Sequence, residues 1–200
     1  MRITYIRMRR MLLIPVLLAA LSAAPPALTQ GVDTAAPEVT ADDPLTSLFE
    51  ALKRERDPET ARGLAQQVMT ELASSGSPTV DLLMQWANTA IAEKRNAAAL
   101  DFLDQATLLQ PNFAEAWNRR AGLHYAMGDK RKSMADIHQV LLREPRHFGA
   151  IAGLAAILSD NGQDEQALRA WERYLEIYPA DREAQQATMS LSEKLAGSRT

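Results

Sequence analysis

The chain has 200 residues, of which 46% are hydrophobic and 24% charged, a composition typical of a globular chain and not of a disordered one. Its 25 acidic side chains exceed the 22 basic ones, and this negative balance argues against nucleic acid as a partner. The absence of cysteine excludes disulfides and a thiolate metal site. Alanine and leucine are abundant while β-branched and aromatic residues are few, which predicts an all-α fold class.

Residues 1–24 have the pattern of a secretory signal peptide. Four arginines form a basic segment, and an apolar run of 14 residues from Met11 to Ala24 follows them. This run is shorter than the roughly 20 residues that a membrane-spanning helix needs. We expect cleavage between roughly 22 and 30, or retention of the segment as an N-terminal anchor, and in both cases export to the periplasm. Without the four arginines, 18 basic side chains stand against 25 acidic ones, a net charge of −7.

The next two segments differ in their apolar pattern. Residues 25–43 are rich in Pro, Ala, Thr and acidic side chains without apolar periodicity, and are predicted to be a flexible linker. Residues 44–79 carry apolar side chains at the spacing of one helical face, in two stretches separated by Asp57 and Pro58. An Asp followed by Pro is typical of a helix N-cap and first turn. This segment is therefore predicted to be a helical hairpin.

Three prolines, Pro111, Pro145 and Pro179, recur at intervals of 34 residues. Cutting the chain at this period gives the segments 80–113, 114–147 and 148–181, which align without a gap. Turn residues lie midway in each segment. Small residues occupy the eighth and twentieth places, and large apolar ones the fourth and twenty-fourth, which lets two antiparallel helices pack closely. The residues at these places are Ala87, Ala121 and Ala155; Ala99, Ser133 and Ala167; Leu83, Trp117 and Ile151; and Leu103, Ile137 and Trp171.

This pattern resembles the tetratricopeptide repeat (TPR), a helix-turn-helix unit with a closing proline. The resemblance covers residues 80–181 and implies three TPR hairpins stacked into a right-handed α-solenoid. Residues 44–79 lie one period upstream, with Ala65 in the place of Ala99, and are expected to be a degenerate first repeat. Residues 182–196 show one apolar stripe and predict a C-terminal capping helix, and residues 197–200 a tail.

The resemblance also implies a concave groove lined by the first helix of each repeat. Some members of the family hold the terminal carboxylate of a peptide with a clamp of five basic and amide side chains. Only Asn88 matches that clamp here, so recognition of a chaperone tail is not supported. The groove instead combines apolar, amide and guanidinium side chains over a glycine and alanine floor, which suits an extended or helical protein segment. Its expected contact residues are Met84, Asn88, Ile91, Asn118, Arg119, Tyr125, Ala152 and Ala156.

Other polar and aromatic residues point to packing. We expect the three tryptophans in the core and His124 to be a half-buried packing residue. The histidines do not stand at ligand spacing with carboxylates, so no metal and no cofactor are predicted. Arg120 occupies the seventh place, which is Trp86 and Leu154 in the flanking segments, and therefore has to pair with a carboxylate or extend to water.

Sequence motifs of enzymes are missing, including G-x-S-x-G, a glycine-rich phosphate loop and H-E-x-x-H, so no enzymatic activity is expected. The sequence predicts an exported, non-enzymatic adaptor or scaffold that binds a peptide segment or partner protein in its groove. Nucleic acid and insertion of the mature domain into a membrane are not expected. The alternatives are a homo-oligomerising structural module and an accessory subunit of a cell-envelope enzyme complex.

Overall fold

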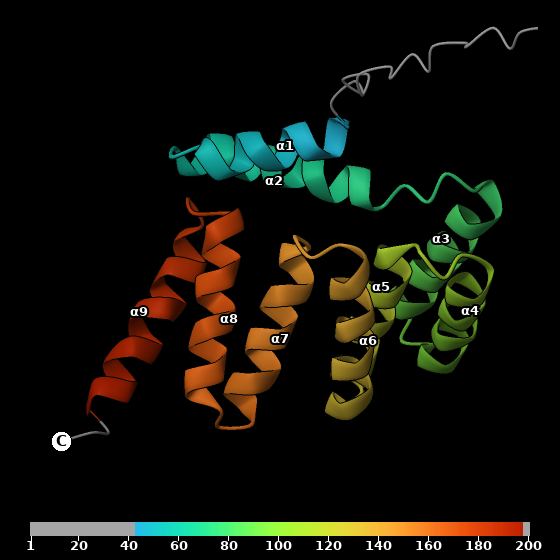
Figure 1. Cartoon of the computed structure of the whole chain (residues 1–200). Coiled ribbons are helices and arrows are strands. Elements are labelled where there is room, and N and C mark those ends of the chain that lie inside the picture. Colours follow the sequence, from blue (N-terminus) through green and yellow to red (C-terminus); the bar gives the residue numbers. More distant parts are fainter. Residues whose placement is uncertain (1–42, 198–200) are drawn as a thin grey trace, which may run out of the picture. The chain divides into compact units, whose positions relative to one another are not determined.

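The structure is a computed structural model that describes residues 43–197. The predicted signal peptide, almost all of the linker and the last three residues lie outside the described part. Residues 43–197 form α-helices and no strand (Figure 1), which confirms the all-α fold class. None of these helices is long and apolar enough to cross a bilayer. The helices are α1 (Pro44–Arg54), α2 (Pro58–Leu72), α3 (Pro78–Ala92), α4 (Asn96–Leu109), α5 (Ala114–Ala126), α6 (Lys130–Arg143), α7 (Phe148–Asp160), α8 (Asp164–Ile177) and α9 (Arg182–Gly197).

Helices α3 to α8 form three antiparallel hairpins, α3/α4, α5/α6 and α7/α8, that follow the 34-residue period of the sequence. The small residues at the eighth and twentieth places are all buried between the two helices of their hairpin. Because no bulky side chain separates the two backbones there, the helices approach closely. This arrangement confirms the predicted TPR hairpins and their stacking into an α-solenoid.

All three hairpins reverse through the same turn, in which an amide just beyond the first helix donates to a carbonyl five residues earlier at 2.8–2.9 Å. The turn needs a left-handed residue at the fifteenth place. Gly128 and Gly162 supply it with φ of 83° and 71°. The first hairpin uses Lys94 at φ 59°, a conformation that is unfavourable for a residue with a Cβ atom.

Consecutive hairpins stack through the third, seventh and tenth places of the first helix, a surface that we call the upstream face. Ala116 and Leu123 of α5 belong to the buried cluster built by α3 and α4. Ala150 and Ile157 of α7 pack in the same way into a cluster with Ile137 of α6. The upstream faces of α5 and α7 are thus each covered by the hairpin that precedes them.

The hairpin formed by α1 and α2 lies across the ends of α7 and α8 (Figure 1). Phe49 and Val68 share one buried cluster with Phe148, Tyr174 and Tyr178. Residues 44–79 are expected to be a degenerate first repeat, and such a repeat would stack on α3 and α4. The hairpin packs on α7 and α8 instead. The three aromatic rings lie 5.9–6.0 Å apart, and together they offer the hairpin a large apolar surface to bury.

Helix α9 packs along α8 and covers the last hairpin, with Ala184 buried between them. Asp181 caps its first turn by accepting hydrogen bonds from the amides of Glu183 and Ala184 at 2.9 and 3.1 Å. The hydroxyl of Tyr174 donates to the other oxygen of Asp181 at 2.6 Å. The start of α9 is therefore tied to α8, where the stack ends.

Candidate binding groove

A cavity of about 400 Å³ opens between α5 and α7, the first helices of the second and third hairpins. Ile91 of α3 borders it on one side, Ile137 of α6 lies at its base, and Met69 of α2 contributes from the N-terminal hairpin. This volume is at the small end of the range for ligand pockets in proteins. The lining residues are Met69, Ile91, Glu115, Asn118, Arg119, Ala121, Gly122, Leu123, Tyr125, Ala126, Ser133, Ile137, Gly149, Ala150, Gly153 and Ile157.

Three glycines line this cavity, namely Gly122, Gly149 and Gly153. A Cβ atom on Gly122 would meet no other atom within 4 Å, so the space above it is free. Gly149 lies under the methyl group of Met69, and a Cβ atom there would stand 3.8 Å from Met69 Cε and 3.4 Å from the His147 ring. Larger side chains at these places would fill the volume that a ligand could occupy.

Arg119 is the main cationic group of the groove. Its Nε donates to Oε1 of the buried Glu115 at 2.6 Å, one helical turn earlier on α5. The terminal guanidinium nitrogens of Arg119 have no partner among the described residues, and the side chain is half exposed. The pair with Glu115 therefore fixes the guanidinium while its outer donors remain available to a ligand.

His147 completes the support beneath Arg119. Its Nδ1 accepts a hydrogen bond from the amide of Ala150 at 3.2 Å and so caps α7. This assignment leaves the proton on Nε2, which donates to Oε2 of Glu115 at 3.1 Å. Asn118 donates to the same oxygen at 2.9 Å. The buried carboxylate thus links the start of α5 to the start of α7.

The environment of Glu115 has opposing effects on its pKa. Burial is the largest effect and raises the pKa. The hydrogen bond from His147 and the charge of Arg119 act in the other direction, and together with smaller contributions they hold the pKa below its ordinary value of 4.5. Glu115 is therefore ionised at neutral pH, and its charge is compensated within the protein.

At the other end of the groove, Tyr125 of α5 donates from its hydroxyl to Oδ2 of Asp160 on α7 at 2.9 Å. Lys130 also contacts this carboxylate at 3.0 Å. The hydrogen bond to Asp160 is the main reason why the pKa of Tyr125 lies above its ordinary value. The groove is consequently bridged by hydrogen bonds at both ends, with the cavity between them.

The predicted contact residues do not all lie in this cavity. Ile91, Asn118, Arg119 and Tyr125 line it. Met84 and Asn88 line a separate, more open hollow of about 500 Å³ at the end of α2. Ala152 packs against the cluster shared with α1 and α2, and Ala156 is half-buried and lines none of the cavities described for residues 43–197. The sequence does not indicate that Met69 lines the groove, because Met69 reaches it only through the unexpected position of α2.

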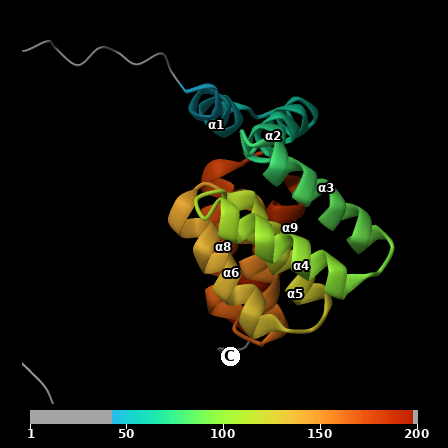
Figure 2. The same ribbon diagram turned by 90° about the vertical axis from the view of Figure 1, so that its right-hand side faces the viewer.

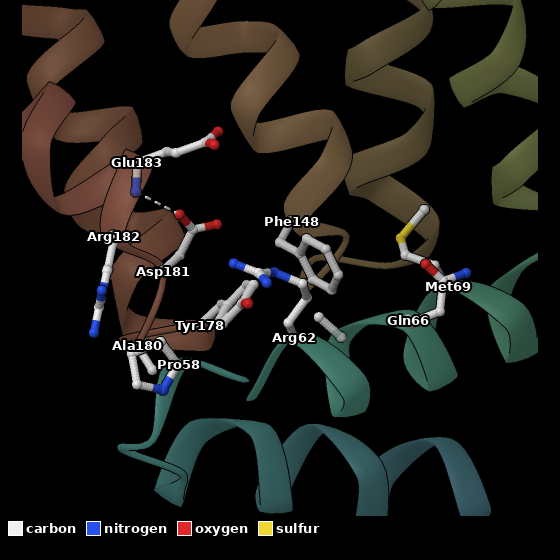
Figure 3. A pocket seen from close by; sticks show the side chains of 11 residues that line it. Pro58, Arg62, Gln66, Met69, Phe148, Tyr178, Ala180, Asp181, Arg182 and Glu183 are labelled. Atoms are coloured by element: carbon white, nitrogen blue, oxygen red, sulfur yellow. Dashed lines mark hydrogen bonds between the residues drawn. The ribbon is translucent and has the colours of Figure 1, made fainter. Parts of the chain in front are cut away.

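A second cavity of about 470 Å³ lies between α2 and the turn from α8 to α9 (Figure 3). Figure 3 shows Arg62 and Tyr178 side by side, with Asp181 directed toward the first turn of α9. Arg62 pairs with Glu59 at 2.7 Å, and both oxygens of Asp181 accept hydrogen bonds. We favour the groove as the binding site, because its lining is mostly apolar and holds the fixed guanidinium of Arg119, whereas polar and apolar atoms line the second cavity about equally.

The remaining sequence expectations concern polar and aromatic packing. Arg120 pairs with Asp136 through two hydrogen bonds of 2.9 and 2.7 Å and reaches Asp104 at 2.7 Å, so of the two expected alternatives it takes the carboxylate pair. Its guanidinium lies 4.7 Å from the ring centre of Trp117, which is half-buried. The expectation of a core position is wrong for Trp86, which is 47% exposed. Residues 43–197 contain no cluster of three or more His, Asp or Glu side chains suited to a metal ion.

These stacked hairpins with a concave cavity define a protein of the tetratricopeptide-repeat class. The chain is 60% identical over 156 residues to a TPR repeat-containing protein of Rhizobium etli, covering 78% of this chain and 76% of that relative. The chain therefore belongs to the TPR-repeat protein family. No protein-family model matches it.

The chain is also similar, at lower identity, to a further curated protein and to solved structures. A heat-shock cognate co-chaperone of Aspergillus fumigatus is 26% identical over 134 residues, and the chain spans 39% of its length. The first TPR domain of Spaghetti (RPAP3), solved with an HSP90 peptide bound, has a TM-score of 0.56 at 19% identity, covering 60% of this chain and 95% of that one. The Sgt2 TPR domain of A. fumigatus has a TM-score of 0.56 at 22% identity over 62% of this chain and 83% of that one.

Proposed function

We propose that this TPR protein is an exported, non-enzymatic adaptor that holds a peptide segment of a partner protein in the groove between α5 and α7. The observation on which this rests is the pairing of an apolar cavity with the outward donors of Arg119. An apolar side chain of the segment fits over Gly122, and a carboxylate or carbonyl group accepts from the guanidinium. TPR proteins are generally non-catalytic scaffolds, which supports a binding role.

The solved complex of a related TPR domain with an HSP90 peptide supports a peptide as the ligand class. The chemistry of the ligand is expected to differ, because the clamp that some TPR domains use is incomplete here. The resemblance places Met84, Gly149 and Gly153 at three of the five clamp positions, and none of them has a cationic or amide side chain. The cation of this groove is instead Arg119 on α5.

A peptide-display selection on the full chain tests the groove. Peptides that bind the wild type should lose binding when Gly122→Leu fills the cavity and when Arg119→Gln removes the cation. Gly63→Leu is the matched control, because Gly63 lies on α2 outside the described cavities and also has free space around it. Selected peptides that bind Gly122→Leu as tightly as wild type would contradict the groove assignment.

The export and the periplasmic location rest on the sequence of residues 1–24 and on the bacterial relative. Fusing residues 1–42 to a reporter enzyme that is active only outside the cytoplasm tests this part. The fusion should be active, and replacing the four arginines of the leader by glutamates should abolish that activity. A reporter that remains inactive with the native leader would rule out export.

A further inference from the structure

The upstream face of the first hairpin differs from its two counterparts in exposure. In the second and third hairpins, the third and tenth places are Ala116, Leu123, Ala150 and Ile157, and all four are at most 4% exposed. In the first hairpin the third and tenth places are Leu82 and Thr89, and both are exposed. The third and tenth places are thus buried in two hairpins and exposed in one. Trp86 at the seventh place is 47% exposed, whereas Arg120 and Leu154 at the same place are half-buried.

The reason for this difference is the position of α1 and α2. A preceding hairpin covers the upstream face of α5 and of α7, whereas α1 and α2 pack onto α7 and α8 instead of α3. Viewed from the side of α3 and α4 (Figure 2), no other helix of the described residues lies in front of these two. The stacking interface of the solenoid therefore has one uncovered copy at this end.

The exposed face is built from aromatic and aliphatic side chains. The rings of Trp86 and Phe102 lie 5.6 Å apart, and with Thr89 and Arg95 they surround a hollow of about 280 Å³. Leu109 is exposed on α4, seven residues from Phe102 and so on the same side of that helix. An apolar surface of this kind on a soluble protein marks an interaction site.

The chemistry at the equivalent places of the other hairpins shows what such a face binds. Trp86 and Phe102 occupy the seventh and twenty-third places, which are Arg120 and Asp136 in the second hairpin and Leu154 and Ala170 in the third. Where the pair is polar, Asp104 of the preceding hairpin forms an ion pair with Arg120. Where Leu154 is apolar, it packs on the cluster that contains Ile137. An aromatic pair accordingly requires an apolar helical surface.

We propose that this surface is the upstream face of a second copy of the chain, so that two molecules pair face to face about a two-fold axis. In the described part of the chain, α9 covers the opposite end of the stack, so that part has no open downstream face for head-to-tail stacking. Among residues 43–197, the open stacking surface that a second copy offers is therefore the same face of α3 and α4. Arg95 borders the hollow and pairs with Glu93 at 2.6 Å, so the charge of Arg95 is compensated within each copy.

Sedimentation equilibrium of the full chain over a wide concentration range tests this pairing. We expect a monomer–dimer equilibrium whose dissociation constant rises at least about 30-fold in Trp86→Glu, as for a central aromatic contact. Leu142→Glu makes the same change of charge at an exposed leucine of α6 outside this face and should leave the equilibrium unchanged. A wild type that is monomeric at every concentration, or an association equally strong in Trp86→Glu, overturns the proposal.

Cross-linking distinguishes this interface from association elsewhere. Because the chain has no cysteine, Thr89→Cys introduces the only thiol, and a short bismaleimide should link two copies of it. Met189→Cys, exposed on α9, should remain unlinked at the same concentration. Efficient linking of Met189→Cys with none of Thr89→Cys would place the contact at the other end of the stack and contradict the proposal.

Discussion

Arg119 and Glu115 lie one turn apart on α5, with Nε of the arginine 2.6 Å from Oε1 of the buried glutamate. The contact compensates the buried carboxylate and fixes the direction of the guanidinium. Arg119→Gln should therefore weaken peptide binding while an amide still donates to Glu115. Arg119→Glu should instead lower the free energy of unfolding by about 1–3 kcal/mol. It places a second carboxylate beside Oε1 of Glu115, which has then lost the hydrogen bond from Arg119. Urea unfolding and peptide titration of both variants separate the two effects.

Gly122→Leu should block the groove without harming the fold. A Cβ atom at this place meets open space, and leucine is a better helix former than glycine by about 0.5–1 kcal/mol. We expect a midpoint of urea unfolding equal to or above that of wild type, together with loss of peptide binding. A destabilised variant would show that the cavity is not available to a side chain at this place.

Lys94→Gly should stabilise the first hairpin by about 1 kcal/mol, because Lys94 adopts a left-handed conformation where the other two hairpins have glycine. Lys94→Ala keeps the Cβ atom and should gain little. Denaturant unfolding of the three proteins provides the measurement. Equal stability of Lys94→Gly and Lys94→Ala would mean that the backbone conformation of this turn is not the source of the effect.

The sequence predicted these hairpins well because their determinants are local. Alternating small and bulky residues define the contact of the two helices, and Gly128 and Gly162 mark the turns. The position of α1 and α2 could not be predicted, since Phe49 and Val68 form an apolar stripe that would fit several surfaces. The contribution of Met69 to the groove and the exposure of Trp86 follow from that position, and both were therefore missed.

Removing one partner of the ion pair of Arg120 and Asp136 should destabilise the protein more than replacing both partners with apolar residues. Asp136→Ala leaves the mostly buried guanidinium with Asp104 alone and should destabilise the protein by about 2–4 kcal/mol. The double variant Arg120→Leu, Asp136→Ala reproduces the residues of the third hairpin and should recover most of this loss. A double variant less stable than Asp136→Ala alone would mean that the ion pair adds net stability and does more than offset the burial of its own charges.

Acidification should remove the stabilisation that Glu115 provides. Because its folded-state pKa lies below the ordinary value of 4.5, this stabilisation is fully present above 4.5 and is lost as the pH falls through the lower, folded-state pKa. Glu115→Gln should be less stable than wild type by about 1–3 kcal/mol at pH 7, and the difference should shrink on acidification. Urea unfolding of both proteins along a pH series isolates Glu115 from the other carboxylates, which titrate in both. A difference that does not change with pH would contradict this account.

The most direct test of the binding role is to map a selected peptide on the protein by amide chemical shifts in solution. The groove account predicts shift changes at Asn118, Gly122 and Gly153 and none at Gly63 of α2. Changes confined to α1 and α2, to the second cavity around Arg62, or to the face of Trp86 would contradict it.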